Sequence, residues 1–207
     1  LVLEANSLKD TELRTYFQKQ AHQEGLTFDK GVFEELLVKS SFDFSDIQKN
    51  LAFLKGYKTE GNISSQDIME AIPKSLQDNI FDMTQLLLRG QIQDVRELVH
   101  DLRLQGEDEI KLIAVMLGQF RTYLQVKLLS AQGKSEQQIV SSLSDYLSRK
   151  VNPFQVRYAI RDSRHLSVAF LKTTIKTLVE TDYQIKTGTL DKDYLLDLAL
   201  LKIASNS

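Results

Sequence analysis

Apolar residues recur at the 3.6-residue period of an α-helix through nearly every segment of this 207-residue chain. Only two prolines, Pro73 and Pro153, interrupt the pattern, and the alternation of β-branched residues that marks strands is nearly absent. An apolar share of 42% is enough to fill a buried core. The sequence therefore predicts an all-α fold.

Short polar residues and glycines divide residues 1–74 into about four short helices. Asp29 is expected to cap the second helix, and Ser45 has the spacing of a capping box with the glutamine three residues later. Ser64 or Ser65 is expected to cap the fourth helix, which a proline ends. This segment is thus predicted to form a small four-helix bundle.

From residue 75 the expected helices lengthen. They span residues 78–89, 92–105, 107–132, 135–147, 153–164, 167–186 and 191–203. The helix over 107–132 opens with three acidic residues, which the helix dipole favours, and carries apolar residues around much of its circumference. So broad an apolar surface predicts burial against several neighbours, and residues 75–207 are predicted to form a larger helical domain.

The chain opens on Leu1-Val2-Leu3, an apolar triplet of strand-like composition without an initiator methionine. We interpret it as the exit of a strand from a preceding domain that has been cut away; the alternative is a processed or chosen start with nothing missing. The first residues lack the basic-then-apolar pattern, so no signal peptide is expected, and no apolar run reaches the roughly 18–20 residues that a membrane span needs. With no cysteine, disulfides and cysteine-based zinc sites are excluded, and a cytoplasmic protein is expected.

The sequence pattern contains no reaction centre. The three histidines are far apart and lack metal-ligand spacing, so neither a metal nor a cofactor is expected. Segment 56–61 resembles part of a phosphate-binding loop, but Asn62 and Ile63 stand where that loop needs Lys and Ser or Thr, so we read it as a loop between helices. Ser163 and His165 are two residues apart and do not face each other on a helix. No intrinsic enzymatic activity is expected.

One basic cluster indicates a possible partner. Arg157, Arg161 and Arg164 are spaced at i, i+4 and i+7, which places them on one face of the helix predicted there, and Arg149 and Lys150 stand in the preceding turn. A basic helix face fits contact with phosphates, yet an aspartate interrupts this one and the net charge of the chain is −2. Three interpretations stay open: sequence-specific DNA reading, non-specific backbone contact, and a solvated or subunit-facing surface.

Four motifs resemble, in order and spacing, the delta subunit family of the bacterial DNA polymerase III clamp loader. They are Asn79-Ile80-Phe81-Asp82-Met83-Thr84 ahead of Gly90, Gln119-Phe120-Arg121, Pro153-Phe154-Gln155-Val156, and Asp182-Tyr183-Gln184-Ile185-Lys186-Thr187-Gly188. By this resemblance residues 75–207 correspond to the family's collar domain and residues 1–74 to the helical lid of an AAA+ module. The family's N-terminal ATPase-like domain has no counterpart in the sequence.

The resemblance implies a non-catalytic subunit of the DNA polymerase III holoenzyme, a DNA-directed DNA polymerase and nucleotidyltransferase complex. Its collar would assemble with the gamma/tau and delta-prime subunits, and the complex would load the sliding clamp on primed DNA during replication. Clamp contact would belong to the family's N-terminal domain.

The lid also bears on nucleotide binding. Active AAA+ ATPases place an arginine near the start of the lid's third helix, where Ser45 stands, and Arg14 is the only arginine among residues 1–74. The resemblance therefore implies no ATP site in this chain. Two alternatives to a clamp-loader subunit stay open: a DNA-binding or transcription-associated helical module that uses the Arg157 face, and a helical adaptor.

Overall fold

The computed structural model describes residues 10–40, 42–148, 151–188 and 190–206. Within them the chain forms eleven helices and one pair of three-residue strands, so the predicted all-α class is confirmed. Two compact units, Leu1–Pro73 and Lys74–Ser207, make up the chain. None of the helices described is both long and apolar enough to cross a bilayer. The Leu1-Val2-Leu3 triplet lies outside the described residues.

The N-terminal unit contains four helices and the strand pair. Its elements are α1 (Asp10–Gln23), β1 (Leu26–Phe28), α2 (Val32–Lys39), α3 (Phe44–Tyr57), β2 (Gly61–Ile63) and α4 (Ser65–Ala71). One apolar cluster joins the four helices, and Phe17 of α1 and Leu36 of α2 have no exposed surface at its centre. Burial of side chains of this size stabilises the unit by about 1.5–3 kcal/mol each.

The periodicity did not indicate the strand pair. β1 and β2 pair in parallel, with Leu26 opposite Gly61 and Phe28 opposite Ile63. Three residues are too few to show an alternating pattern, and both strands lie in segments that the periodicity predicts as loops. Leu26 and Ile63 are nonetheless buried, so the pair closes the helical core on this side.

Two predicted helix caps are wrong. α3 is capped by Asp43, whose side chain accepts from the backbone N–H of Ser45, so Ser45 lies inside the first turn. α2 follows Gly31, which adopts a left-handed conformation at φ 87°, and Asp29 lies two residues before it. Several short polar residues precede each helix, and the sequence does not say which of them takes the cap conformation. The Ser64 cap of α4 is confirmed, with a capping box to the residue three positions later.

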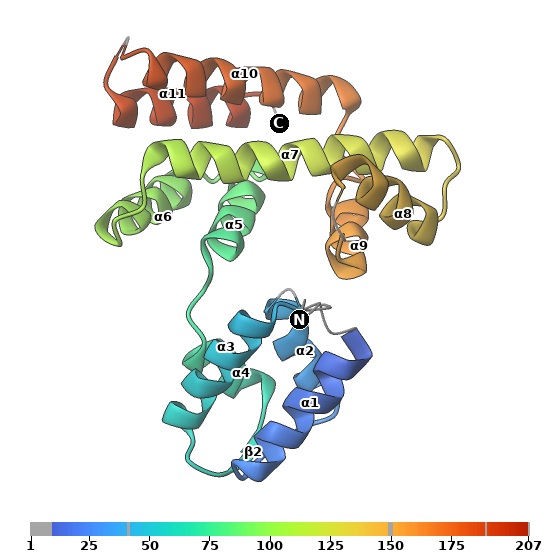
Figure 1. Ribbon diagram of the computed structural model, residues 1–207. Helices are drawn as coiled ribbons and strands as arrows, with labels where there is room; N and C mark the ends of the chain where they lie inside the picture. Colours follow the sequence, from blue (N-terminus) through green and yellow to red (C-terminus); the bar gives the residue numbers. More distant parts are fainter. Residues whose placement is uncertain (1–9, 41, 149–150, 189, 207) are drawn as a thin grey trace, which may run out of the picture. The chain divides into compact units, whose positions relative to one another are not determined.

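The C-terminal unit contains the longer helices. They are α5 (Leu76–Leu88), α6 (Ile92–Leu104), α7 (Glu109–Ala131), α8 (Glu136–Leu147), α9 (Pro153–Asp162), α10 (Val168–Lys186) and α11 (Lys192–Ala204). In Figure 1, α10 runs along α7, with α5 and α6 near the N-terminal half of α7 and α8 and α9 near its C-terminal half. α11 packs against α10 and also contacts α5, α6 and α7. Met116 and Phe120 of α7 are completely buried in the core of this unit.

The motif over residues 182–188 is a helix terminus. Lys186 Nζ donates to Asp182 Oδ2 at 2.8 Å on the last turn of α10, and Thr187 Oγ1 donates to Tyr183 O at 2.9 Å. Gly188 then takes a positive φ of 66°, the left-handed conformation that ends many helices. The motif therefore stops α10 at the turn that leads into α11.

Candidate subunit and nucleic-acid surfaces

The predicted basic helix face is only partly present. Arg157 and Arg161 lie one turn apart on α9, and 62% and 64% of their side chains are exposed. α9 ends two residues earlier than predicted, so Arg164 belongs to the following turn and does not continue the helical row. Arg149 and Lys150 lie outside the described residues. Two of the five predicted residues thus share a helix face.

Acidic side chains pair with both of these arginines. Arg157 reaches from α9 to α8, where its Nε and Nη2 atoms donate to Glu136 Oε1 at 3.1 and 3.0 Å. Arg161 Nε donates to Asp162 Oδ1 at 2.8 Å, and its guanidinium lies 5.1 Å from the centre of the Tyr158 ring. Exposed ion pairs contribute roughly 0–1 kcal/mol. A phosphate or carboxylate of a partner could therefore replace Glu136 at small cost.

Lys127 fixes the end of α9 against α7. Its Nζ donates to the carbonyl oxygens of Ser163 and Arg164, both at 3.1 Å. These carbonyls follow the last turn of α9, where unpaired acceptors and the helix dipole favour a cation. Ser163 is buried and its Oγ donates to Ala159 O at 2.6 Å. This serine therefore serves the helix end and is not placed as a nucleophile.

α11 is apolar on both of its faces. The face in the core carries Leu195, Leu196, Ala199, Leu200 and Ile203, all buried. On the opposite face lie Tyr194 and Leu201, which are 56% and 43% exposed, and the half-buried Leu198 between them. Their i, i+4, i+7 spacing aligns them along the helix, and these three residues form the α11 stripe.

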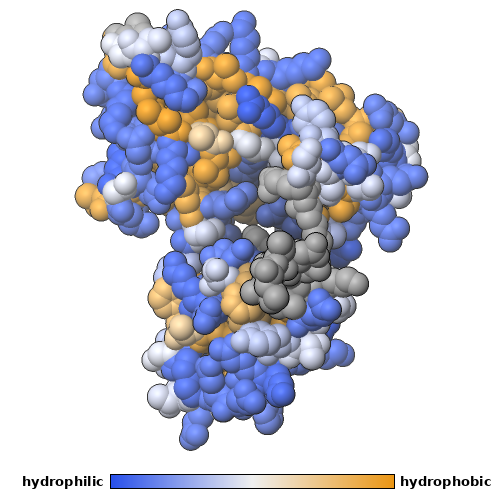
Figure 2. Space-filling view, viewed as in Figure 1, coloured by the Kyte–Doolittle hydropathy of each residue, from blue (hydrophilic) through white to orange (hydrophobic). Residues whose placement is uncertain are grey.

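An apolar stripe on an already packed helix is unusual. A helix that is apolar all round is normally buried on all sides, and the α11 stripe instead faces solvent. In Figure 2, apolar side chains gather on the visible face of the C-terminal unit over the region of α11 and α7. The α11 stripe is therefore a candidate docking surface. It was not predicted from the sequence, where only the basic residues in and before α9 were named as a surface.

A charged cluster attaches the start of α11 to the turn between α6 and α7. Glu109 Oε1 accepts from Arg103 Nε at 2.9 Å, and Lys192 Nζ lies 2.8 Å from Glu109 Oε2. Lys192 also donates to Asp108 Oδ2 at 2.7 Å, and Arg103 Nη2 lies 3.5 Å from Asp197 Oδ1. Since α6, α7 and α11 all contribute residues, this cluster sets the direction of α11 and of its stripe.

Glu109 is a buried carboxylate that its partners keep ionised. Only 4% of its side chain is exposed, and burial by itself raises the pKa of a carboxyl group. Hydrogen bonds from Lys192, from its own backbone and from Arg103 outweigh this burial and lower the pKa of Glu109 to about 2. The neighbouring Asp193 has a raised pKa, first because of its contact with Glu109 and second because of burial. Glu109 therefore carries its charge at neutral pH.

The described residues of the N-terminal unit form neither a phosphate-binding loop nor an arginine site at the start of α3. Tyr57 ends α3 and Gly61 begins β2, so segment 56–61 joins a helix to a strand instead of cradling a phosphate at a helix start. Arg14 is ion-paired with Glu34, and Ser45 lies in the first turn of α3. Across the described ranges, no three histidine or acidic side chains are grouped to hold a metal ion.

Comparison with known proteins places the chain in a family. The family model for the DNA polymerase III delta subunit, C-terminal domain, matches residues 77–203. DNA polymerase III subunit delta of Bacillus subtilis (strain 168) is 32% identical over 206 residues, which cover 98% of this chain and 57% of that protein. The solved DNA clamp loader delta protein of Bacillus subtilis superposes with a TM-score of 0.76 at 31% identity, over 97% of this chain and 58% of the other.

The chain spans less than two thirds of the length of these relatives. The family model nevertheless matches more than half of the chain and most of the C-terminal unit. The resemblance found in the sequence motifs is thereby confirmed, and the chain belongs to the DNA polymerase III delta subunit family.

Proposed function

We propose that this chain is the assembly part of a clamp-loader delta subunit. Its C-terminal unit joins the gamma/tau and delta-prime subunits in a collar, and residues 1–74 act as a lid-like link to the domain that engages the sliding clamp. The assembled complex loads the clamp on primed DNA. Family membership supports this role, and the two-unit organisation of the chain is compatible with it.

The observation that carries the proposal is the α11 stripe. Partner subunits need an apolar surface held in a fixed direction, because interface cores are apolar and packed like protein interiors. Tyr194 and Leu201 provide exposed apolar side chains on a helix whose other face is buried in the core. The Arg103–Glu109–Lys192 contacts hold that helix in place.

A matched pair of substitutions tests the stripe. Leu201 on α11 and Leu128 on α7 are 43% and 42% exposed, so Leu201→Glu and Leu128→Glu place the same charge at equally exposed sites. Co-purification with gamma/tau and delta-prime should weaken for Leu201→Glu and stay unchanged for Leu128→Glu. Normal assembly of the Leu201→Glu chain would reject α11 as the docking surface.

The proposed role is non-catalytic, and no nucleotide site is expected in this chain. Arg14, the single arginine of residues 1–74, is held by Glu34 and lies on α1. Calorimetric titration of the full chain with ATP and Mg²⁺ should show no saturable binding. A dissociation constant below about 100 μM, equivalent to roughly 5.5 kcal/mol, would contradict this part of the proposal.

A second candidate function is contact with the sugar-phosphate backbone of DNA. It rests on the exposed guanidinium groups of Arg157 and Arg161, and on the exposed ion pair with Glu136 that a phosphate could replace at Arg157. Replacing Arg157, Arg161 and Arg164 by Gln removes three charges and keeps helix propensity. Each lost phosphate contact should lower the salt slope of DNA binding by about 0.7–0.9. An unchanged affinity and slope in the assembled complex would leave the arginines as a solvated surface.

A further inference from the structure

Asp162 is the residue that interrupts the basic face in the sequence, between Arg161 and Arg164. It ends α9, and only 8% of its side chain is exposed, against 64% for Arg161. Its Oδ1 accepts from Arg161 Nε at 2.8 Å, while its Oδ2 is enclosed and has no hydrogen-bond partner among the described residues. The aspartate therefore lies on the protein side of the arginine and does not compete with it at the surface.

The bond between these two residues resists exchange. Arg161 is the only ion-pair partner of Asp162 among the residues that the structure describes. Were Arg161 to swing away, it would leave a nearly buried carboxylate without a cation, which costs far more than breaking an exposed pair. Arg161 must therefore meet any ligand from its present position.

Tyr158 fixes the plane of the same guanidinium group. Its ring is 43% exposed, and the centre of the Arg161 guanidinium lies 5.1 Å from the centre of the ring. Residues three apart share a helix face, and a guanidinium over an aromatic face is attracted by the ring. The bond to Asp162 thus sets the direction of the guanidinium, and the Tyr158 ring sets its plane.

The outer edge of the Arg161 guanidinium remains open. Neither of its Nη atoms has a hydrogen-bond partner among the described residues. These two groups present parallel N–H donors, which match two oxygens of a phosphate or carboxylate. Because the guanidinium is already held in place, it loses little side-chain freedom when an anion binds.

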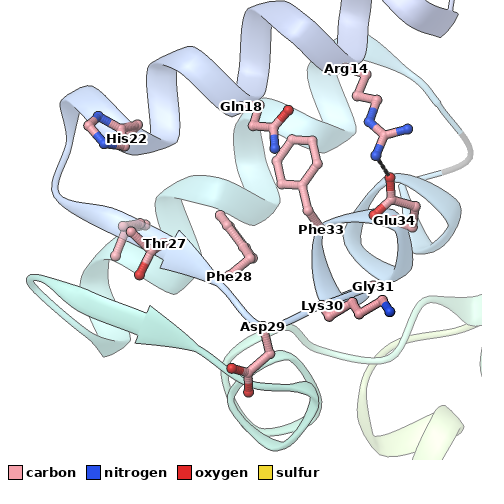
Figure 3. A pocket seen from close by; sticks show the side chains of 11 residues that line it. Arg14, Gln18, His22, Thr27, Phe28, Asp29, Lys30, Gly31, Phe33 and Glu34 are labelled. Carbon is pink, nitrogen blue, oxygen red and sulfur yellow. Dashed lines mark ion pairs between the residues drawn. The ribbon is translucent and has the colours of Figure 1, made fainter.

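Two other arginines are held in a different way. Glu136 is 34% exposed and accepts from both Nε and Nη2 of Arg157, so it occupies donors that a phosphate would need. Figure 3 shows Arg14 of α1 reaching Glu34 of α2, and these side chains are 52% and 39% exposed. Neither carboxylate is enclosed as Asp162 is, so neither arginine is anchored from below.

The charges around Arg161 favour phosphates over a single carboxylate. Arg164 adds an exposed side chain in the turn after α9, without an acidic partner in the described part of the chain. Arg157, Arg161 and Arg164 thus stand against Glu136 and the enclosed Asp162. Several neighbouring cations on one surface suit a chain of phosphates, which carries one charge at every nucleotide.

We propose that Asp162 is a positioning residue that holds Arg161 for end-on contact with a phosphate of the DNA backbone. The inference rests on the second candidate function and names the residue on which that contact depends. It has an unusual consequence: removal of the Asp162 side chain weakens DNA binding, although the loss of a negative charge by itself should strengthen it.

Two substitutions at Asp162 separate position from charge. Asp162→Ala removes the charge and the acceptor of Arg161 Nε, whereas Asp162→Asn removes the same charge and keeps an acceptor oxygen. The chain is assembled with gamma/tau and delta-prime, and binding of fluorescein-labelled primed DNA is followed by fluorescence anisotropy over a series of salt concentrations. Asp162→Ala should weaken binding about threefold or more and lower the salt slope by about 0.7–0.9, the value of one phosphate contact. Asp162→Asn should bind as tightly as the native chain or more tightly.

A matched control and a double variant complete the test. Glu136→Gln removes the acid that pairs with Arg157 and should leave binding unchanged or strengthen it. In an Arg161→Gln background, Asp162→Ala should have no further effect, because a residue that acts through another is not additive with it. Damage to the fold of α9 would instead weaken binding in both backgrounds.

Three results would overturn the proposal. If Arg161→Gln weakens binding while Asp162→Ala and Asp162→Asn strengthen it equally, the DNA contact stands and the positioning role is rejected. An equal loss from Asp162→Ala in the native and Arg161→Gln backgrounds would assign Asp162 to the fold alone. If Arg161→Gln changes neither affinity nor salt slope, Arg161 makes no phosphate contact, and the second candidate function fails together with the proposal.

Discussion

The substitution Glu109→Gln tests whether the charged cluster holds α11 in place. Gln keeps the shape of the side chain and removes the charge that Arg103 and Lys192 surround. The pKa of Glu109 falls from its ordinary value of 4.5 to about 2 in the folded protein. At about 1.4 kcal/mol for each pKa unit, ionised Glu109 contributes on the order of 3 kcal/mol to the free energy of unfolding at neutral pH.

The sign of the pH dependence follows from the lowered pKa. Between the folded value of about 2 and the unfolded value of 4.5, the unfolded chain binds more protons. The contribution of Glu109 is therefore complete above pH 4.5 and is lost as the pH falls toward 2. By about pH 3 more than half of the difference in stability between the native chain and Glu109→Gln should have disappeared.

Urea unfolding at pH 7, 5 and 3 measures this difference. The chain has no tryptophan, so Phe170→Trp in all variants supplies a fluorescent reporter within the C-terminal unit, beside Phe120. Glu107→Gln is the control: Glu107, whose side chain is 23% exposed, forms an i, i+4 pair with the exposed Lys111, which is worth about 0.3–0.5 kcal/mol. A Glu109→Gln effect below about 1 kcal/mol, or one independent of pH, would refute the reasoning.

Three further outcomes are expected. Phe120→Ala, at a fully buried site, should lower the free energy of unfolding by about 3–5 kcal/mol in urea titrations, whereas the 38% exposed Phe53 should tolerate Ala within about 1 kcal/mol. Ser64→Ala removes the capping box of α4 and should cost about 1 kcal/mol in the same assay. Because burial raises the pKa of Tyr123 to about 12, an absorbance titration at 295 nm should show one phenol ionising near pH 12 that Tyr123→Phe abolishes.

The helices of the C-terminal unit could be predicted from the sequence to within two residues at each end. Long segments with a sustained 3.6-residue period leave little ambiguity, and residues such as Ser135 and Gly188 mark their ends clearly. The strand pair could not be predicted, because its stability comes from pairing across more than thirty residues of chain and not from a local pattern. The cap of α3 was misplaced because Asp43 and Ser45 are both good caps.

The candidate surfaces were harder to predict than the fold. The predicted face of three arginines required a helix that continued to residue 164, whereas α9 ends at Asp162. From the sequence, Glu109 was explained only as one of three acidic residues that the helix dipole favours. Its cluster with Arg103 and Lys192 could not be predicted, because it joins residues from three different helices. The α11 stripe did have a local signal: nine of the thirteen residues of α11 are apolar, which leaves too few polar positions for a solvent-facing side.

Hydroxyl-radical footprinting of the full chain, alone and assembled with gamma/tau and delta-prime, tests the central claim most directly. Tyr194 of the α11 stripe and Tyr146 of α8 are 56% and 74% exposed, so both should be labelled in the isolated chain. If α11 docks on a partner subunit, the labelling of Tyr194 and Leu201 falls on assembly while the labelling of Tyr146 persists. Unchanged labelling of Tyr194 and Leu201 in the assembled complex would contradict the account.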